Sequence, residues 1–203
     1  MKRVVFLLVL LLAVFAVYWF KFRKTEHGPD VKAESIAVKK HSPAFNESID
    51  NMVDAYLDIK DAFVDADTTL AKQHTREFIS LIDSVKIDEL KNDKEAIVET
   101  AKSNLADIKA NAVSLLSQTD ITEMRQDFRM VTEMMYPSFF KTINYEGRNL
   151  YLQNCPMAFG EDKAANWISN SAEVVNPYLG KKHPEYKATM LHCGEVKDTI
   201  KAQ

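Results

Sequence analysis

The two cysteines of this 203-residue chain lie near its C-terminal end, and each has a methionine close by. One residue separates Cys155 from Met157, and two residues separate Met190 from Cys193. Thiolate and thioether sulfurs are soft donors that prefer soft ions, with copper(I) first among the biological ones. The same two thiols could instead form a disulfide. The sequence therefore poses a choice between a metal site and a covalent link.

The spacing around the cysteines is compatible with both chemistries. In an extended segment alternate side chains share a face, so Cys155 and Met157 are expected on one side, and so are Met190 and His192. Cys193 joins them if the chain turns at the glycine that follows it. The candidate ligands for copper(I) or silver(I), with zinc ranking second, are Cys155, Met157, Met190, Cys193 and, as an optional fifth, His192. A disulfide would close a loop of nearly forty residues, which is worth about 3 to 4 kcal/mol in the chain-entropy model.

The N-terminal residues predict a membrane segment. An uninterrupted apolar run from Val4 to Phe20 is flanked by basic residues on both sides. A helix over this run spans roughly 26 Å, near the lower limit for a bilayer core. The aromatic residues at its end suit a membrane interface and are a poor context for cleavage, which favours an anchor over residues 1–24 rather than a cleaved signal. In both cases we expect the remainder on the periplasmic side of the cytoplasmic membrane.

Such a location affects how the rest of the chain is interpreted, because oxidising compartments stabilise disulfides. Beyond the anchor and its basic flanks the chain has 21 basic and 29 acidic residues, a formal net charge of −8. Nucleic acid is therefore not expected as a partner.

Residues 25–44 contain few large apolar residues and are interrupted by Gly28-Pro29 and Ser42-Pro43, so they are interpreted as a linker.

Residues 45–146 show the periodicity of amphipathic helices. The four apolar stripes run from Ile49 to Phe63, from Leu70 to Val85, from Ile97 to Leu116 and from Ile121 to Phe139. Because the connections between them are short, neighbouring helices should be antiparallel, and the economical architecture is an up-down four-helix bundle.

Local signals predict where these helices begin and end. Asp67 is a start signal for the second helix. The pairs Asn92/Glu95 and Asp120/Glu123 have capping-box spacing before the third and fourth helices. Pro137 is expected to kink or end the fourth helix near Tyr136.

The sequence lacks the usual signatures of enzymes and cofactor-binding bundles. There is no Cys-x-x-Cys-His motif for haem attachment and no Glu-x-x-His pair for a di-iron site. Phosphate-binding glycine loops, a G-x-S-x-G elbow and a Cys-x-x-Cys motif are also missing, so neither enzymatic activity nor an organic cofactor is expected. His74 lies on an apolar stripe and is interpreted as a hydrogen-bonded core histidine, and the methionines of the fourth helix as packing residues.

Residues 147–203, called the cap here, lose the helical periodicity. Leu150–Leu152 are expected to form a short strand, and glycines and prolines interrupt the rest. The few large apolar residues available to dock on the bundle include Trp167, Ile168, Tyr178 and Leu191. A segment with so small a core needs a further link, which the two cysteines could supply. The predicted fold class is therefore all-α with a small irregular cap that contains short strands.

Several motifs together resemble a known family. They are Tyr56–Ala62 (YLDIKDA), Tyr151–Ala158 (YLQNCPMA), Ala165–Ser169 (ANWIS), Asn176–Tyr178 (NPY) and Met190–Gly194 (MLHCG). They resemble a family of envelope domains of unknown function that also occurs at the C-terminal end of some periplasmic adaptor subunits of copper and silver efflux pumps. One departure is the insertion Lys181–Thr189, which adds His183 between the last two motifs.

The resemblance implies an envelope domain associated with copper or related heavy metals. It carries Cys155, Met157, Met190 and Cys193 over as metal ligands and implies efflux or envelope proteins as partners, besides the membrane itself. We therefore expect a membrane-anchored domain that binds or relays copper(I) in metal efflux or homeostasis. The alternative is a structural or interaction module of the cell envelope whose two cysteines form a disulfide.

Overall fold

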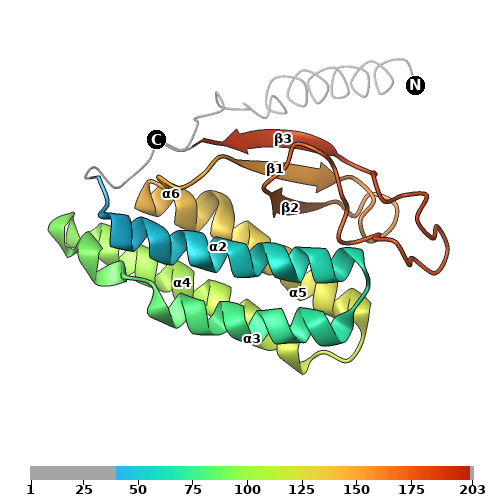
Figure 1. The fold of residues 1–203 in the computed structure, drawn as a ribbon, viewed down its shortest axis with the longest axis horizontal. Coiled ribbons are helices and arrows are strands. Elements are labelled where there is room, and N and C mark those ends of the chain that lie inside the picture. Colours follow the sequence, from blue (N-terminus) through green and yellow to red (C-terminus); the bar gives the residue numbers. More distant parts are fainter. Residues whose placement is uncertain (1–39, 202–203) are drawn as a thin grey trace, which may run out of the picture. The chain divides into compact units, whose positions relative to one another are not determined.

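The computed structural model describes residues 40–201 (Figure 1). The predicted membrane segment and most of the predicted linker lie outside the described residues. Within residues 40–201, no helix combines the length and the apolar character needed to cross a membrane.

Four helices contain nearly half of the described residues. They are α2 (Pro43–Val64), α3 (Thr68–Ser84), α4 (Glu95–Ser117) and α5 (Ile121–Glu133). A short 3-10 helix, η1 (Ile87–Asn92), precedes α4, and α5 continues through a π-helical segment, η2 (Met134–Phe139), into α6 (Phe140–Ile143). Each helix packs on the next one along the chain, and α2 and α5 also meet, with the rings of Tyr56 and Phe128 stacked at 4.9 Å. The prediction of four packed helices is confirmed.

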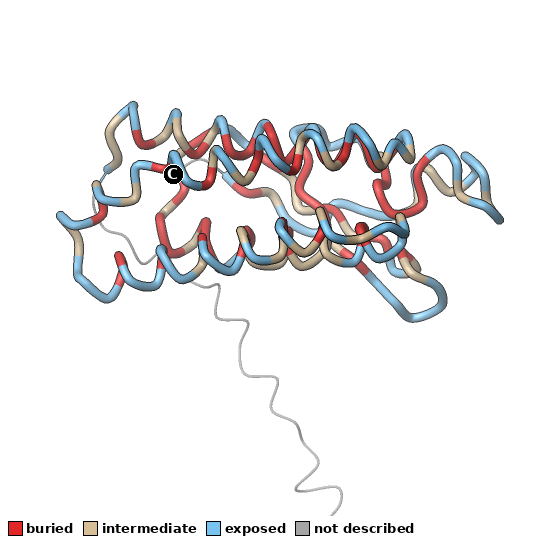
Figure 2. Tube along the Cα trace, turned by 90° about the horizontal axis from the view of Figure 1, so that it is seen from below, coloured by how far each residue is buried: buried red, intermediate tan, exposed pale blue. Residues whose placement is uncertain are grey.

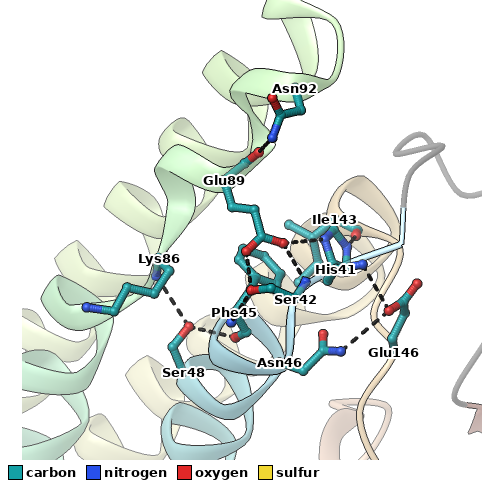
Figure 3. A network of polar contacts seen from close by, with 10 residues as sticks. All are labelled: His41, Ser42, Phe45, Asn46, Ser48, Lys86, Glu89, Asn92, Ile143 and Glu146. Atoms are coloured by element: carbon teal, nitrogen blue, oxygen red, sulfur yellow. Dashed lines mark hydrogen bonds and ion pairs between the residues drawn. The ribbon is translucent and has the colours of Figure 1, made fainter.

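The first helix begins inside the stretch assigned to the linker. Ser42 is its N-cap, with Oγ accepting the N–H of Phe45 at 3.1 Å, and Pro43 occupies the first helical position, where no N–H is needed. Glu89 of η1 accepts both the N–H and the Oγ–H of Ser42, and Glu146 accepts the N–H of His41 (Figure 3). The Ser42-Pro43 pair therefore starts a helix, where the sequence analysis expected an interruption.

The second helix is rotated relative to the predicted stripe. Its buried residues are Ala71, Thr75, Phe78 and Ile82, and Leu70 is 39% exposed. His74 is half-buried, with Nδ1 3.9 Å from Asp58 Oδ2 and 3.7 Å from Glu77 Oε2. The prediction of a hydrogen-bonded core histidine is wrong, because the ring lies at the edge of the α2–α3 interface beside carboxylates.

Some of the helix start and end signals predicted from the sequence agree with the structure and others do not. Asp120 caps α5 as predicted, accepting the N–H groups of Thr122 and Glu123. Asn92 does not cap α4: it ends η1, and its side chain donates to Glu89 O at 3.3 Å. The chain kinks at Tyr136, whose φ of −134° and ψ of 130° are not helical, and helical structure then resumes.

The cap is more regular than predicted. It forms one antiparallel sheet of three strands in the order β2-β1-β3, with β1 (Leu150–Cys155), β2 (Ala165–Ser169) and β3 (Glu195–Ile200). The sheet lies on one side of the helices, with β2 against α5 and α2 (Figure 1).

The helices and the sheet share one hydrophobic core. Trp167, Ile168 and Tyr178, predicted to dock the cap, are buried, and the Tyr178 ring lies 6.2 Å from Phe128 of α5 and 6.0 Å from Trp167. Buried residues line the inward sides of the helices and continue into the cap (Figure 2). The buried residues of the cap are therefore held in place by packing against the bundle.

Candidate thiol site

The structure brings the two cysteines together at one end of the sheet. Cys155 is the last residue of the central strand β1, and Cys193 lies just before the edge strand β3. The two strands pair antiparallel, with Asn154 opposite Glu195. The Sγ atoms are 2.9 Å apart although 38 positions separate the residues in the sequence, and both thiols are free.

This distance lies between two chemical states. A disulfide bond between the sulfurs is about 2.05 Å long. Two sulfurs bound at about 2.3 Å to one tetrahedral ion lie roughly 3.8 Å apart. A movement of about 0.9 Å inward or outward would therefore produce either state. The contact makes both states accessible and favours neither.

The two thiols differ in exposure. Cys155 is fully buried, whereas Cys193 is half-buried. Loss of hydration on burial, together with the hydrogen bond and the charge of Cys155, raises the pKa of Cys193 to about 12. A second thiolate beside the first is thus strongly disfavoured unless a cation lies between them. A bound cation reverses this effect because it stabilises both thiolates.

Asn176 positions Cys193. This buried side chain donates from Nδ2 to Cys193 O at 2.8 Å, and the Asn176 N–H donates to Leu191 O at 2.8 Å. Its Oδ1 accepts the N–H groups of Tyr178 and Leu179. All polar side-chain groups of Asn176 are therefore used to hold the turn before β3. From the sequence Asn176 stands out only as part of the NPY motif, and its role in holding Cys193 is not predicted.

Gly194 allows the two strands to approach beside the thiols. Its φ is +138°, and a Cβ at this position would lie 2.5 Å from Asn154 O and 3.0 Å from Cη2 of Trp167. A larger residue would collide with the backbone of β1 next to Cys155. A turn at Gly194 was the condition for Cys193 to join the other ligands, but the turn ends at His192 and Gly194 leads directly into β3.

The geometry expected for the methionines and His192 is wrong. Pro156 and Met157 form a turn directly after β1, and Met190 to His192 form another, so the alternation of an extended segment does not apply. Both methionines are half-buried and pack against the hydrophobic core. His192 is exposed, with Nδ1 2.7 Å from Val174 O.

The insertion Lys181–Thr189 forms a closed loop of its own. The N–H of Lys187 donates to His183 O at 2.9 Å, and His183 Nδ1 accepts the N–H groups of Glu185 and Tyr186. The insertion therefore does not keep the two cysteine motifs apart.

The donor set at the thiols can be compared with the needs of different ions. In residues 40–201, no group of three or more His, Cys, Asp or Glu side chains is arranged to hold a metal ion. Two adjacent thiols suit a soft, low-coordinate ion such as copper(I) or silver(I), whereas magnesium and calcium need oxygen ligands. The residues present therefore fit a soft cation.

A second polar cluster, shown in Figure 3, contains residue types found in hydrolytic triads. However, the Ser42 hydroxyl donates to Glu89, and the His41 ring contacts Ile143 O through Nε2. Because the hydroxyl does not meet the imidazole, these contacts do not form a nucleophile–base pair. They fix the start of α2.

Fold and site together define a helical domain with a small antiparallel sheet that carries two contacting thiols. A family model described as a protein of unknown function (DUF3347) matches residues 52–145. The match begins within α2, continues through α6 and ends before β1, so the cysteine motifs lie outside it. No curated protein and no solved structure gave a significant match.

Proposed function

We propose that this protein is a membrane-anchored, extracytoplasmic domain that binds or relays copper(I) through Cys155 and Cys193. The observation that carries the proposal is the 2.9 Å contact between two free thiols from distant parts of the sequence. Asn176 holds the turn before β3 and Gly194 lets the two strands approach, and both features support the proposal that the fold specifies this contact. The family resemblance supports a role in metal efflux or homeostasis.

In this proposal the two thiolates are the strong ligands. Binding would move the sulfurs apart by about 0.9 Å and release both thiol protons to solvent. Met157 and Met190 are weak ligands that would have to turn from their apolar packing towards the ion. Weak thioether ligation allows the ion to leave again, as a relay requires.

The test is copper(I) binding by the reduced full-length protein in detergent, measured anaerobically by competition with a chromophoric chelator. We expect one tightly bound ion per chain, and no such binding when Cys155→Ser and Cys193→Ser are combined. A matched control replaces two methionines of the helical core, Met124→Leu and Met135→Leu, and should retain the ion. Undiminished binding by the double serine variant would refute the proposal.

The alternative is an envelope interaction module whose cysteines form a permanent disulfide. The observations that favour it are a sulfur contact only about 0.9 Å longer than a disulfide bond and methionines that pack against the core. Thiol counting on denatured protein isolated from its own compartment separates the two functions. No reactive thiol, and no metal uptake after mild reduction, would favour the module.

A further inference from the structure

The two histidines of the cap are held in opposite tautomers. His192 Nδ1 lies 2.7 Å from Val174 O. A carbonyl oxygen can only accept, so Nδ1 must carry a proton, and the lone pair of the neutral ring is on Nε2. His183 Nδ1 instead accepts the N–H groups of Glu185 and Tyr186, both at 3.2 Å, so its ring proton is on Nε2.

The same chain segment orients His192 and Cys193. Val174 O accepts from His192, the Asn176 N–H donates to Leu191 O, and Asn176 Nδ2 donates to Cys193 O. Three consecutive residues of the turn are therefore fixed by one neighbouring segment. His192 is exposed, Cys193 is half-buried and Cys155 is fully buried. Exposure to solvent therefore decreases from His192 through Cys193 to Cys155.

The tautomer of His192 is the one that metal-binding histidines use. Such residues donate one ring N–H to a backbone carbonyl or carboxylate, which orients the ring and leaves the other nitrogen free to bind. Imidazole is a suitable ligand for copper. His183 lacks this arrangement because its Nδ1 is occupied by two backbone donors.

We propose that His192 Nε2 is the first ligand through which copper(I) or silver(I) reaches and leaves the thiol pair. This inference rests on the proposed function. The Nε2–metal bond forms as a ligand of the incoming carrier leaves, and the ion then passes to the two sulfurs as both thiol protons are released to solvent. No electron is transferred. His192 therefore controls the rate of exchange, whereas the thiols control the affinity.

The test measures transfer of copper(I) from loaded, reduced full-length protein to excess bathocuproine disulfonate by stopped-flow absorbance. We expect His192→Gln to keep the equilibrium affinity within about threefold and to slow transfer by about tenfold or more. The matched control is His183→Asn, because an asparagine oxygen can still accept the backbone N–H groups two and three residues on. This control should transfer at the rate of the unmodified protein.

A direct readout is nitrogen NMR of the histidine rings with one equivalent of silver(I), which is diamagnetic. We expect Nδ1 of His192 to be protonated before and after addition, and Nε2 to shift on addition. A proton on Nε2 of His192 in the free protein, or an unchanged transfer rate in His192→Gln with tight binding preserved, would overturn this inference alone. Absence of copper(I) and silver(I) binding by the unmodified protein would overturn the proposed function, and the role of His192 with it.

Discussion

The phenol oxygen of Tyr56, in α2, accepts the N–H of Ile168, in β2, at 3.0 Å. The same hydroxyl contacts Thr132 Oγ1 of α5 at 2.6 Å, and Tyr56 is fully buried. Burial raises the pKa of Tyr56 well above its ordinary value, so the hydroxyl stays neutral and serves as both donor and acceptor. Two helices and one strand therefore meet at a single oxygen atom, and this contact links the bundle to the sheet that carries the thiols.

The change Tyr56→Phe tests this link. It leaves the Ile168 N–H buried without its acceptor, which should lower the free energy of unfolding by about 1 to 3 kcal/mol. Urea unfolding followed by circular dichroism measures the effect. The control is Tyr151→Phe on β1, where the ring is half-buried and the change should have little effect. Equal stabilities of the two variants would contradict the role assigned to Tyr56.

The helical part of this fold could be predicted from the sequence because its signals are local and repeated. The α4 stripe from Ile97 to Leu115 recurs over many turns, and Asp120 lies next to the N–H groups that it caps. The buried face of α3 was harder to predict, because Leu70 and Ala71 are neighbours and only packing decides which one faces the core.

The sheet and the details of the site could not be predicted in the same way. Strand β3 is mostly exposed and its residues, Glu195–Ile200, alternate too weakly in polarity to indicate a strand. The two cysteines could be identified as possible partners from the sequence because the chain contains no others. Asn176 was missed because its role depends on a contact with Cys193, 17 positions away, that no local pattern encodes.

Two glycine substitutions can separate backbone strain from collision at the thiol site. Gly194 and Gly160 both have positive φ, +138° and +108°, but a Cβ at Gly160 meets nothing within 4 Å. Gly160→Ala should therefore cost about 1 to 2 kcal/mol, from backbone strain alone. Gly194→Ala adds the collision with Asn154 O and should lower the free energy of unfolding by a larger amount. Urea unfolding of both variants measures the difference. Equal losses would show that strands β1 and β3 can move apart without cost.

The reactivity of Cys193 with iodoacetamide tests the thiol contact without any metal. Because its pKa is raised to about 12, the thiol stays protonated at pH 8, and labelling should be slow until the pH approaches that value. The change Cys155→Ser removes the charge of the neighbouring thiol, while burial, the largest cause of the raised pKa, remains. The pKa of Cys193 should therefore fall part of the way towards its ordinary value, and labelling at pH 8 should accelerate by about tenfold.

The pH dependence of the labelling rate distinguishes a lowered pKa from simple exposure. A lowered pKa moves the whole rate profile of Cys155→Ser to lower pH, whereas exposure alone raises the rate by the same factor at every pH. The raised pKa also means that the folded state favours the protonated thiol, so this contribution to stability is present at neutral pH and is lost as the pH rises towards 12. Identical profiles for the two proteins would argue against the contact.

The near-isosteric change Asn176→Asp tests the positioning of Cys193. An aspartate oxygen can still accept from Tyr178 and Leu179, but the group that donated to Cys193 O becomes a second acceptor. A buried carboxylate oxygen facing a carbonyl oxygen should cost about 3 kcal/mol or more, or else push the turn away from the core. We expect faster labelling of Cys193 and weaker copper(I) binding.

The control is Asn166→Asp, because Asn166 uses its side-chain oxygen to accept from Asn154 and keeps this contact as aspartate. If both variants retained the labelling rate of the unmodified protein, Asn176 would not be what holds Cys193 against Cys155.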